Sequence, residues 1–165
     1  MTDTLRLVPG AAGADQPPPA GIAHVLARLG QRLVAAPMAA LLEVADLGEV
    51  TPVPLAPGWL LGITNLRGTV VPVVDLAALL GWEAGVPGRR ALVLRDGRFR
   101  LALPVHEVQS VRWLELATVA VEQGMAAEGD IARAATVDQR SVWVIDAEAM
   151  LARLRRGDQV VMAGR

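Results

Sequence analysis

The sequence contains no cysteine, which excludes disulfide bonds, thiolate metal sites and cysteine nucleophiles. It contains no lysine either, so the glycine-lysine pair that ends a phosphate-binding P-loop is missing. A net charge of −1 supplies no basic field for nucleic acid or an anionic membrane. No apolar run approaches the roughly 18 residues of a membrane span, and the N-terminus lacks a basic region followed by an apolar one. We therefore expect a cytoplasmic protein.

Aromatic residues are scarce, with one phenylalanine, four tryptophans and no tyrosine. The core must therefore be built from leucine, valine, isoleucine and alanine, and each tryptophan is a potential anchor. A chain of 165 residues fits one domain, or two small subdomains that share an apolar seam.

The clearest pattern is a β-hairpin between residues 58 and 81. A short strand ending at Leu66 meets Arg67-Gly68, and residues 69–74 return as a β-branched apolar run. Gly68 supplies the backbone freedom that a tight turn needs. The apolar run has no polar alternation, which predicts a strand buried on both faces. Pro72 lacks an N–H group, which predicts an edge or a bulge at that position.

Two aspartates directly follow apolar strands. Facing one another, Asp75 and Asp146 would suit a glycosidase or an aspartic protease. Each also stands where a helix N-cap belongs, before helices expected at 76–80 and 147–156. Gly81 is placed to end the first of these helices. We interpret both aspartates as caps and expect no catalytic residue.

His24 and His106 are residues of a type that could bind a metal or act as a catalytic base. They lie far apart, and neither has a second histidine or a cysteine at ligand spacing. Neither belongs to a nucleophile motif such as Gly-x-Ser-x-Gly. We therefore expect no metal site and no cofactor.

The rest of the chain is a series of short strand candidates separated by turn residues. Strands are expected at 22–29, 33–36, 91–95, 98–103 and 142–145, and Asp96-Gly97 predicts a hairpin. Residues 38–44 fit either a helical turn or a strand, and residues 115–137 carry no readable pattern. The run 98–103 alternates, which predicts one wet face. Such punctuation favours small barrels over a βαβ sheet.

A family resemblance rests on the segment Gly62-Ile63-Thr64-Asn65-Leu66-Arg67-Gly68, followed by Val71-Pro72-Val73-Val74-Asp75-Leu76. This pattern resembles the signature of CheW-like proteins, the adaptors that couple bacterial chemoreceptors to the histidine kinase CheA. Weaker matches, such as Glu43-Val44, extend over residues 20–156. The resemblance implies a mainly β fold of two small five-stranded SH3-like barrels packed side by side, with short helices and a C-terminal helix.

The expected domain organisation follows from that resemblance and from composition. Residues 1–20 form a disordered tail, residues 21–156 a single CheW-like domain, and residues 157–165 a frayed end. The first barrel is expected at roughly 21–84 and the second at roughly 89–145, and the sequence leaves open which strands cross between them.

The resemblance also implies a function. It implies a non-enzymatic scaffold that binds the regulatory domain of a CheA-type kinase and the helical tip of a chemoreceptor, in chemotaxis or pilus-driven motility. An arginine at a hairpin turn is by itself usually solvated, but the resemblance links this turn to partner contacts. Gly62 is expected to serve the backbone. The residues expected to bind partners are Trp59, Ile63, Asn65, Leu66, Arg67 and Gly68.

A second reading is a small-barrel nucleic-acid binder. Arg95, Arg98 and Arg100 cluster and would contact phosphates. The nearest aromatic residue, Phe99, is expected to point to the other side of its strand. This reading is kept as the alternative.

Overall fold

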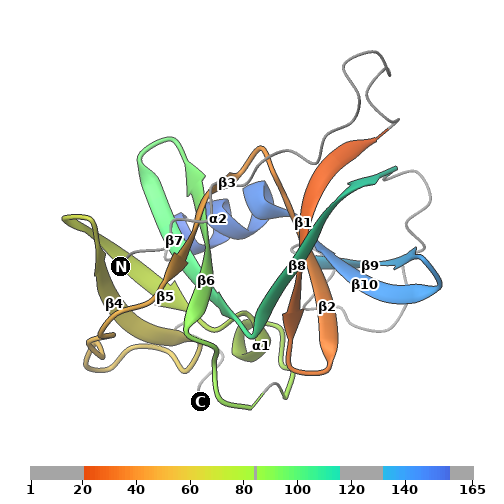
Figure 1. Ribbon diagram of the computed structural model, residues 1–165. Helices are drawn as coiled ribbons and strands as arrows, with labels where there is room; N and C mark the ends of the chain where they lie inside the picture. The colour runs from red at the N-terminus through yellow and green to blue at the C-terminus, as the bar shows by residue number, and fades with distance from the viewer. Residues whose placement is uncertain (1–20, 84, 116–131, 157–165) are drawn as a thin grey trace.

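The computed structural model describes residues 21–83, 85–115 and 132–156. The tail expected at 1–20 and the frayed end expected at 157–165 lie outside the described residues. Within the described ranges, ten strands form two five-stranded sheets that lie side by side, with two helices (Figure 1). The expected mainly β fold class of two packed five-stranded units is confirmed.

One sheet, here called sheet A, contains both the first and the last strands of the described chain. Its neighbours are antiparallel except β2 and β10, which are parallel. In spatial order its strands are β8 (Glu107–Leu114), β1 (Ile22–Leu29), β2 (Arg32–Pro37), β10 (Arg140–Ile145) and β9 (Ala132–Val137).

Sheet B is built from the middle of the chain. Residues 38–40 form a turn that leads into its first strand, so the ambiguous segment 38–44 is a turn and then a strand. Only the β5–β7 pair is parallel. In spatial order its strands are β3 (Leu41–Asp46), β6 (Arg90–Asp96), β7 (Phe99–Val105), β5 (Thr69–Val74) and β4 (Leu60–Leu66).

The sheets do not divide the chain between residues 84 and 89. β1 and β2 pair with strands that begin after residue 106, while β6 and β7 pair with strands of the first half. The parallel β2–β10 pair requires a long crossover connection, and that connection contains the whole of sheet B. Barrels at 21–84 and 89–145 therefore do not describe the two sheets.

Sheet B closes on itself between its two edges. The backbones of Thr51, after β3, and Ile63, on β4, exchange hydrogen bonds of 2.8 and 2.9 Å. A Cβ atom at Gly62 would lie 2.2 Å from the Thr51 carbonyl oxygen, and Gly62 has a φ of +148°. Only glycine permits so close an approach, which explains this residue of the motif.

Three apolar clusters fill the molecule. One lies within sheet A, around Leu26 and Val142, and one within sheet B, around Val73 and Val93. The third, here called the seam cluster, joins both sheets to the helices α1 (Leu76–Leu79) and α2 (Ala147–Arg156). No described helix is long and apolar enough to cross a membrane. The seam cluster makes the two sheets one folding unit.

Strand β5 differs from its expected form. Val71, Val73 and Val74 are buried, but Val70 at the hairpin tip is 63% exposed, so the strand is buried on both faces only in its second half. β5 is also an interior strand, so of the two positions predicted for Pro72 the edge is wrong. The β4–β5 pair does have a register shift, between Leu60 and Gly62 opposite Val74 and Val73. Towards β7 only Val73 is paired, and the missing Pro72 N–H therefore breaks no ladder on that side.

Candidate functional site

The β4–β5 hairpin turns at Arg67 and Gly68, whose φ angles are +50° and +84°. Positive φ at both central residues defines a type I′ turn, for which asparagine or glycine is the preferred first residue. The Gly68 N–H donates to the Asn65 Oδ1 at 2.8 Å and supports the turn. An arginine in this left-handed conformation costs roughly 1 kcal/mol. Turn stability therefore does not explain Arg67.

The Arg67 guanidinium pairs with Glu43, with an Nη2–Oε2 distance of 3.0 Å. The Arg67 side chain is 74% exposed and that of Glu43 is 24% exposed. Such a surface pair adds about 0–1 kcal/mol to stability. It joins the hairpin turn to β3, the opposite edge of sheet B. Sequence reasoning missed this partner because only closure of the sheet brings the two residues together.

A hollow of about 260 Å³ lies beside this ion pair. Glu43 and Arg67 form one side of it, and Arg100 of β7 forms another. The remaining lining residues are Leu42, Leu66 and Thr69. The hollow is thus mainly polar and charged, with a small apolar contribution from the two leucines, which suits a polar side chain of a partner.

The other expected site residues divide into exposed and supporting ones. Ile63 and Asn65 are exposed on the same face of β4, and Leu66 packs half-buried against the cluster within sheet B. Trp59 is half-buried against the seam cluster. Across the hairpin, Val70 pairs with Asn65 and adds exposed apolar surface that sequence reasoning missed. The outer face of the hairpin is therefore a small, partly apolar platform beside Arg67.

Both aspartates are engaged at helix starts. Asp75 Oδ1 accepts a hydrogen bond from the Ala78 N–H at 3.1 Å, and Asp146 Oδ1 accepts one from the Ala149 N–H at 2.9 Å. Gly81, with a φ of +71°, follows α1. These carboxylates satisfy helix ends and do not form an acid–base pair.

His24 is buried on β1, and its Nδ1–H donates to the Ile22 carbonyl at 2.8 Å. Burial lowers the pKa of the His24 imidazole, and the hydrogen bond to the backbone opposes that shift. Among residues 21–83, 85–115 and 132–156, no group of three or more histidine or acidic side chains could hold a metal ion.

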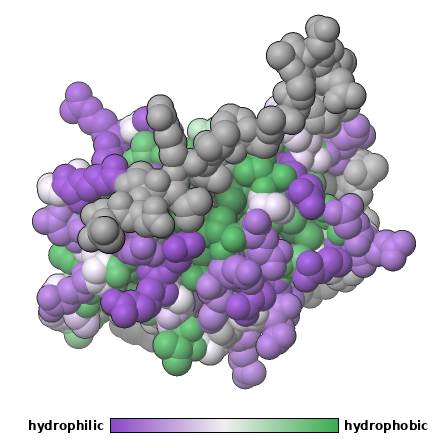
Figure 2. All heavy atoms as spheres, viewed as in Figure 1, coloured by the Kyte–Doolittle hydropathy of each residue, from purple (hydrophilic) through white to green (hydrophobic). Residues whose placement is uncertain are grey.

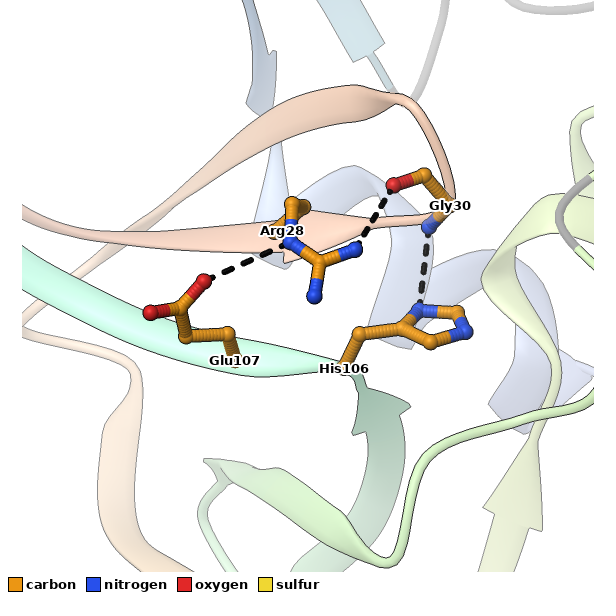
Figure 3. Close-up of polar contacts among 4 residues, drawn as sticks. All are labelled: Arg28, Gly30, His106 and Glu107. Atoms are coloured by element: carbon orange, nitrogen blue, oxygen red, sulfur yellow. Dashed lines mark hydrogen bonds and ion pairs between the residues drawn. The ribbon is translucent and has the colours of Figure 1, made fainter.

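His106 ties three segments together (Figure 3). Its Nδ1 accepts a hydrogen bond from the Gly30 N–H at 3.0 Å, so its Nε2 carries the proton and donates to the Val86 carbonyl at 2.9 Å. Beside it, Arg28 donates to the Gly30 carbonyl and pairs with Glu107 at 3.3 Å. A histidine suits this position because one ring both accepts and donates. An ionised carboxylate in its place could accept from the Gly30 N–H but could not donate to the Val86 carbonyl. The histidine is therefore a structural tie.

A second surface lies where the two sheets meet. Val111 and Trp113 on β8 are 37% and 46% exposed. The β1–β8 register pairs them with Val25 and Ala23, so they extend the row that Val25 begins in the seam cluster. Figure 2 shows apolar residues gathered in the middle of this view, between the two sheets.

Nothing in the local sequence marks Trp113 as the exposed one of the four tryptophans. Trp82, which follows the hairpin motif, is buried and packs against Trp143 at an interplanar angle of 57°, with ring centroids 5.0 Å apart. The Arg32 guanidinium covers the Trp82 ring at 4.6 Å. Trp82 therefore belongs to the core, and the exposed tryptophan is Trp113 on an edge strand.

Comparisons with known proteins agree with this architecture. The CheW-like domain family matches residues 23–155. A chemotaxis protein CheW from Rhizobium meliloti is 37% identical over 67 residues, which is 41% of this chain and 43% of that protein. A probable chemotaxis protein CheW from Rhizobium etli is 28% identical over 128 residues, covering 74% of this chain and 83% of that protein. The first alignment thus spans less than half of the relative.

A solved structure shares the fold. The crystal structure of the scaffolding protein TtCheW from Thermoanaerobacter tengcongensis aligns with a TM-score of 0.69 at 21% sequence identity. The alignment covers 82% of this chain and 90% of that chain.

Proposed function

Because this chain belongs to the CheW-like family, we propose that it is a chemosensory adaptor in the cytoplasm, holding a chemoreceptor and a CheA-type histidine kinase in one complex. It acts by binding and not by catalysis. The observation that carries the proposal is Arg67, a strained, exposed arginine at a turn that would be more stable with another residue.

The kinase regulatory domain docks on the β4–β5 hairpin. The outer face of the hairpin offers Ile63 and Val70 as apolar contacts, and Arg67 stands at its tip. Arginine with its planar fork binds carboxylates and carbonyl groups in bidentate geometry, which favours it at interfaces. Glu43 orients the guanidinium before the partner arrives, which lowers the entropy cost of binding.

The receptor tip lies against the surface where the sheets meet. Val111 and Trp113 supply an apolar row there, and a partly exposed tryptophan is a common centre of binding energy. An amphipathic helix, laid along this row, would bury its apolar face against both sheets. The two docking surfaces are built from different sheets, so both partners can be held at once.

The nucleic-acid alternative finds no support on the arginine-bearing strand. The β6–β7 register places Arg95 opposite Arg100 on one face, while Phe99 packs half-buried against the seam cluster. Stacking on bases needs an exposed ring beside the cations.

The test of this proposal is Arg67→Asn. Asparagine suits the first position of a type I′ turn, so the variant should melt at or above the parent temperature despite losing the Glu43 pair. Its affinity for the kinase regulatory domain should fall about thirtyfold, the loss of roughly 2 kcal/mol expected for an interface anchor. Arg67→Lys should restore only part of that affinity, because a point charge lacks the bidentate fork.

The receptor surface needs its own variant. Trp113→Ala should weaken binding of the receptor tip and leave kinase binding near the parent value. Calorimetric titration of both partners on the same preparations separates the two surfaces. Unchanged kinase affinity in Arg67→Asn would remove the hairpin from the kinase interface.

A further inference from the structure

Arg100 is the cation of the hollow that has no counter-ion. Among the described residues it makes no hydrogen bond and no ion pair, although it is half-buried. Glu43, the acidic residue lining the same hollow, gives its carboxylate to Arg67. One positive charge in the hollow therefore remains uncompensated.

The strand register pairs Arg100 with a second arginine across β6 and β7. Arg95 and Arg100 are directly opposite on β6 and β7, on the face that buries Val93 and Ala102 inside sheet B. Like charges opposite one another on neighbouring strands are destabilising. The two side chains diverge, however, because Arg95 lines a different cavity from Arg100, so Arg100 faces the hollow as its unpaired cation.

The lining of the hollow defines the group that would fill it. The lining is mainly polar: Thr69 offers a hydroxyl, and Leu42 and Leu66 add a small apolar contact for a short aliphatic stem. Arg100 offers a guanidinium at the same hollow. An aliphatic stem ending in an acceptor-only, negatively charged group is a glutamate or aspartate side chain.

We propose that this hollow receives an acidic side chain of the partner bound at the β4–β5 hairpin, and that Arg100 binds its carboxylate. The inference rests on the proposed function, because it assigns the chemistry of the kinase domain's contact. Arg67, oriented by Glu43, contacts the partner at the hairpin tip, while Arg100 supplies the uncompensated charge that selects an acidic side chain.

The occupant is an acidic protein side chain and not a nucleic-acid phosphate. The volume of about 260 Å³ suits one side chain. Phe99, the aromatic residue beside Arg100, points into the seam cluster and offers no stacking surface.

The experiment compares Arg100→Gln with Arg98→Gln. Arg98 lies in the turn between β6 and β7, just before the strand that carries Arg100. It is exposed and does not line the hollow, so it controls for a general loss of charge. Affinity for the kinase regulatory domain is measured by calorimetry at about 50 mM and about 300 mM salt. Melting curves of each variant establish that both are folded.

We expect Arg100→Gln to lose roughly tenfold or more in affinity and to show a weaker salt dependence than the parent. Arg100→Lys should keep most of the salt dependence, Arg100→Glu should bind more weakly than Arg100→Gln, and Arg98→Gln should bind like the parent. Arg100→Gln should melt close to the parent, because Arg100 makes no hydrogen bond or ion pair with the described residues that the change would remove.

The failure of this inference is distinguishable from the failure of the proposed function. If the parent does not bind the kinase domain, the proposed function falls. If Arg67→Asn loses binding while Arg100→Gln binds normally, the hairpin interface stands and the hollow is not its acidic contact. Equal losses in Arg98→Gln and Arg100→Gln would mean a diffuse basic field instead. Single-stranded DNA that binds the parent but not Arg100→Gln would assign the hollow to phosphate.

Discussion

His24 and His106 are equally isolated in the sequence, yet the fold gives their rings opposite hydrogen-bonding roles. His24 donates through Nδ1 to a backbone carbonyl, whereas His106 accepts through Nδ1 and donates through Nε2. In the sequence neither has a second histidine or a cysteine at metal-ligand spacing. The sequence could not identify their backbone partners, because Gly30 and Val86 reach His106 only through the folded arrangement of the strands.

The lowered pKa of His24 makes stability depend on pH. The neutral ring is favoured in the folded protein, so the unfolded chain binds more protons below the ordinary histidine pKa of 6.5. The contribution of the His24 ring to the free energy of unfolding is therefore greatest above pH 6.5, and it falls as the pH drops towards the lowered pKa of the folded protein. Denaturant titrations of the parent and His24→Gln at a series of pH values should show the parent's advantage shrinking on acidification. An advantage that grows on acidification would contradict the assigned direction.

At the residue scale the candidate site was only half predictable. The spacing of the motif pointed to Arg67, but neither the family match at Glu43 nor the arginine cluster at Arg100 placed these residues beside it. Each lies on a different strand from Arg67, and they meet only because sheet B curls until Thr51 pairs with Ile63. Contacts made by closure of a sheet are invisible to a reading based on local pattern.

At the scale of elements, turns and caps were the most readable features. Arg67-Gly68 and Asp96-Gly97 both mark hairpins, since glycine relieves the backbone strain that each turn imposes. Strand faces were less readable. Residues 98–103 alternate in polarity, but Ala102 is as buried as Leu101 and Leu103, because its face packs inside sheet B. Only the hairpin end, at Arg98 and Arg100, reaches the surface.

The helix caps give a prediction at this scale. Asp75→Ala and Asp146→Ala should each lower the free energy of unfolding by about 1 kcal/mol, because each leaves a first-turn N–H without its acceptor. Serine at either position should retain most of the stability, since its hydroxyl also caps helices. Chemical denaturation measures both. An Asp75→Ala protein more stable than the parent would show that the carboxylate is strained and serves something other than the helix.

At the scale of the whole molecule, the seam cluster couples the sheets. Met150 of α2 is fully buried there, among residues from both sheets. Met150→Ala should cost about 2–5 kcal/mol through loss of packing and the cavity left behind. Because both sheets rest on this cluster, unfolding should remain a single transition in which tryptophan fluorescence and far-ultraviolet circular dichroism change together. Arg153→Ala, on the same helix but partly exposed, should change stability by about 0.5 kcal/mol or less.

Two transitions separated in denaturant would show that one sheet survives without the other. The sequence did anticipate an apolar seam, from the marginal size of two separate barrels. It did not show that β1 and β2 belong with the last strands, because strand pairing across a long connection leaves no trace in local periodicity.

The division of strands between the sheets also sets an order of events during synthesis on the ribosome. β1 and β2 are made before any strand of sheet B, but their neighbours β8, β9 and β10 follow all of it. The strands of sheet B, residues 41–105, form one continuous stretch that can pair as soon as it emerges. The β1–β2 hairpin must wait, with both of its edges open, until the last strands arrive. A ribosome that pauses after residue 105 would therefore leave the β1–β2 hairpin exposed, although it was made first.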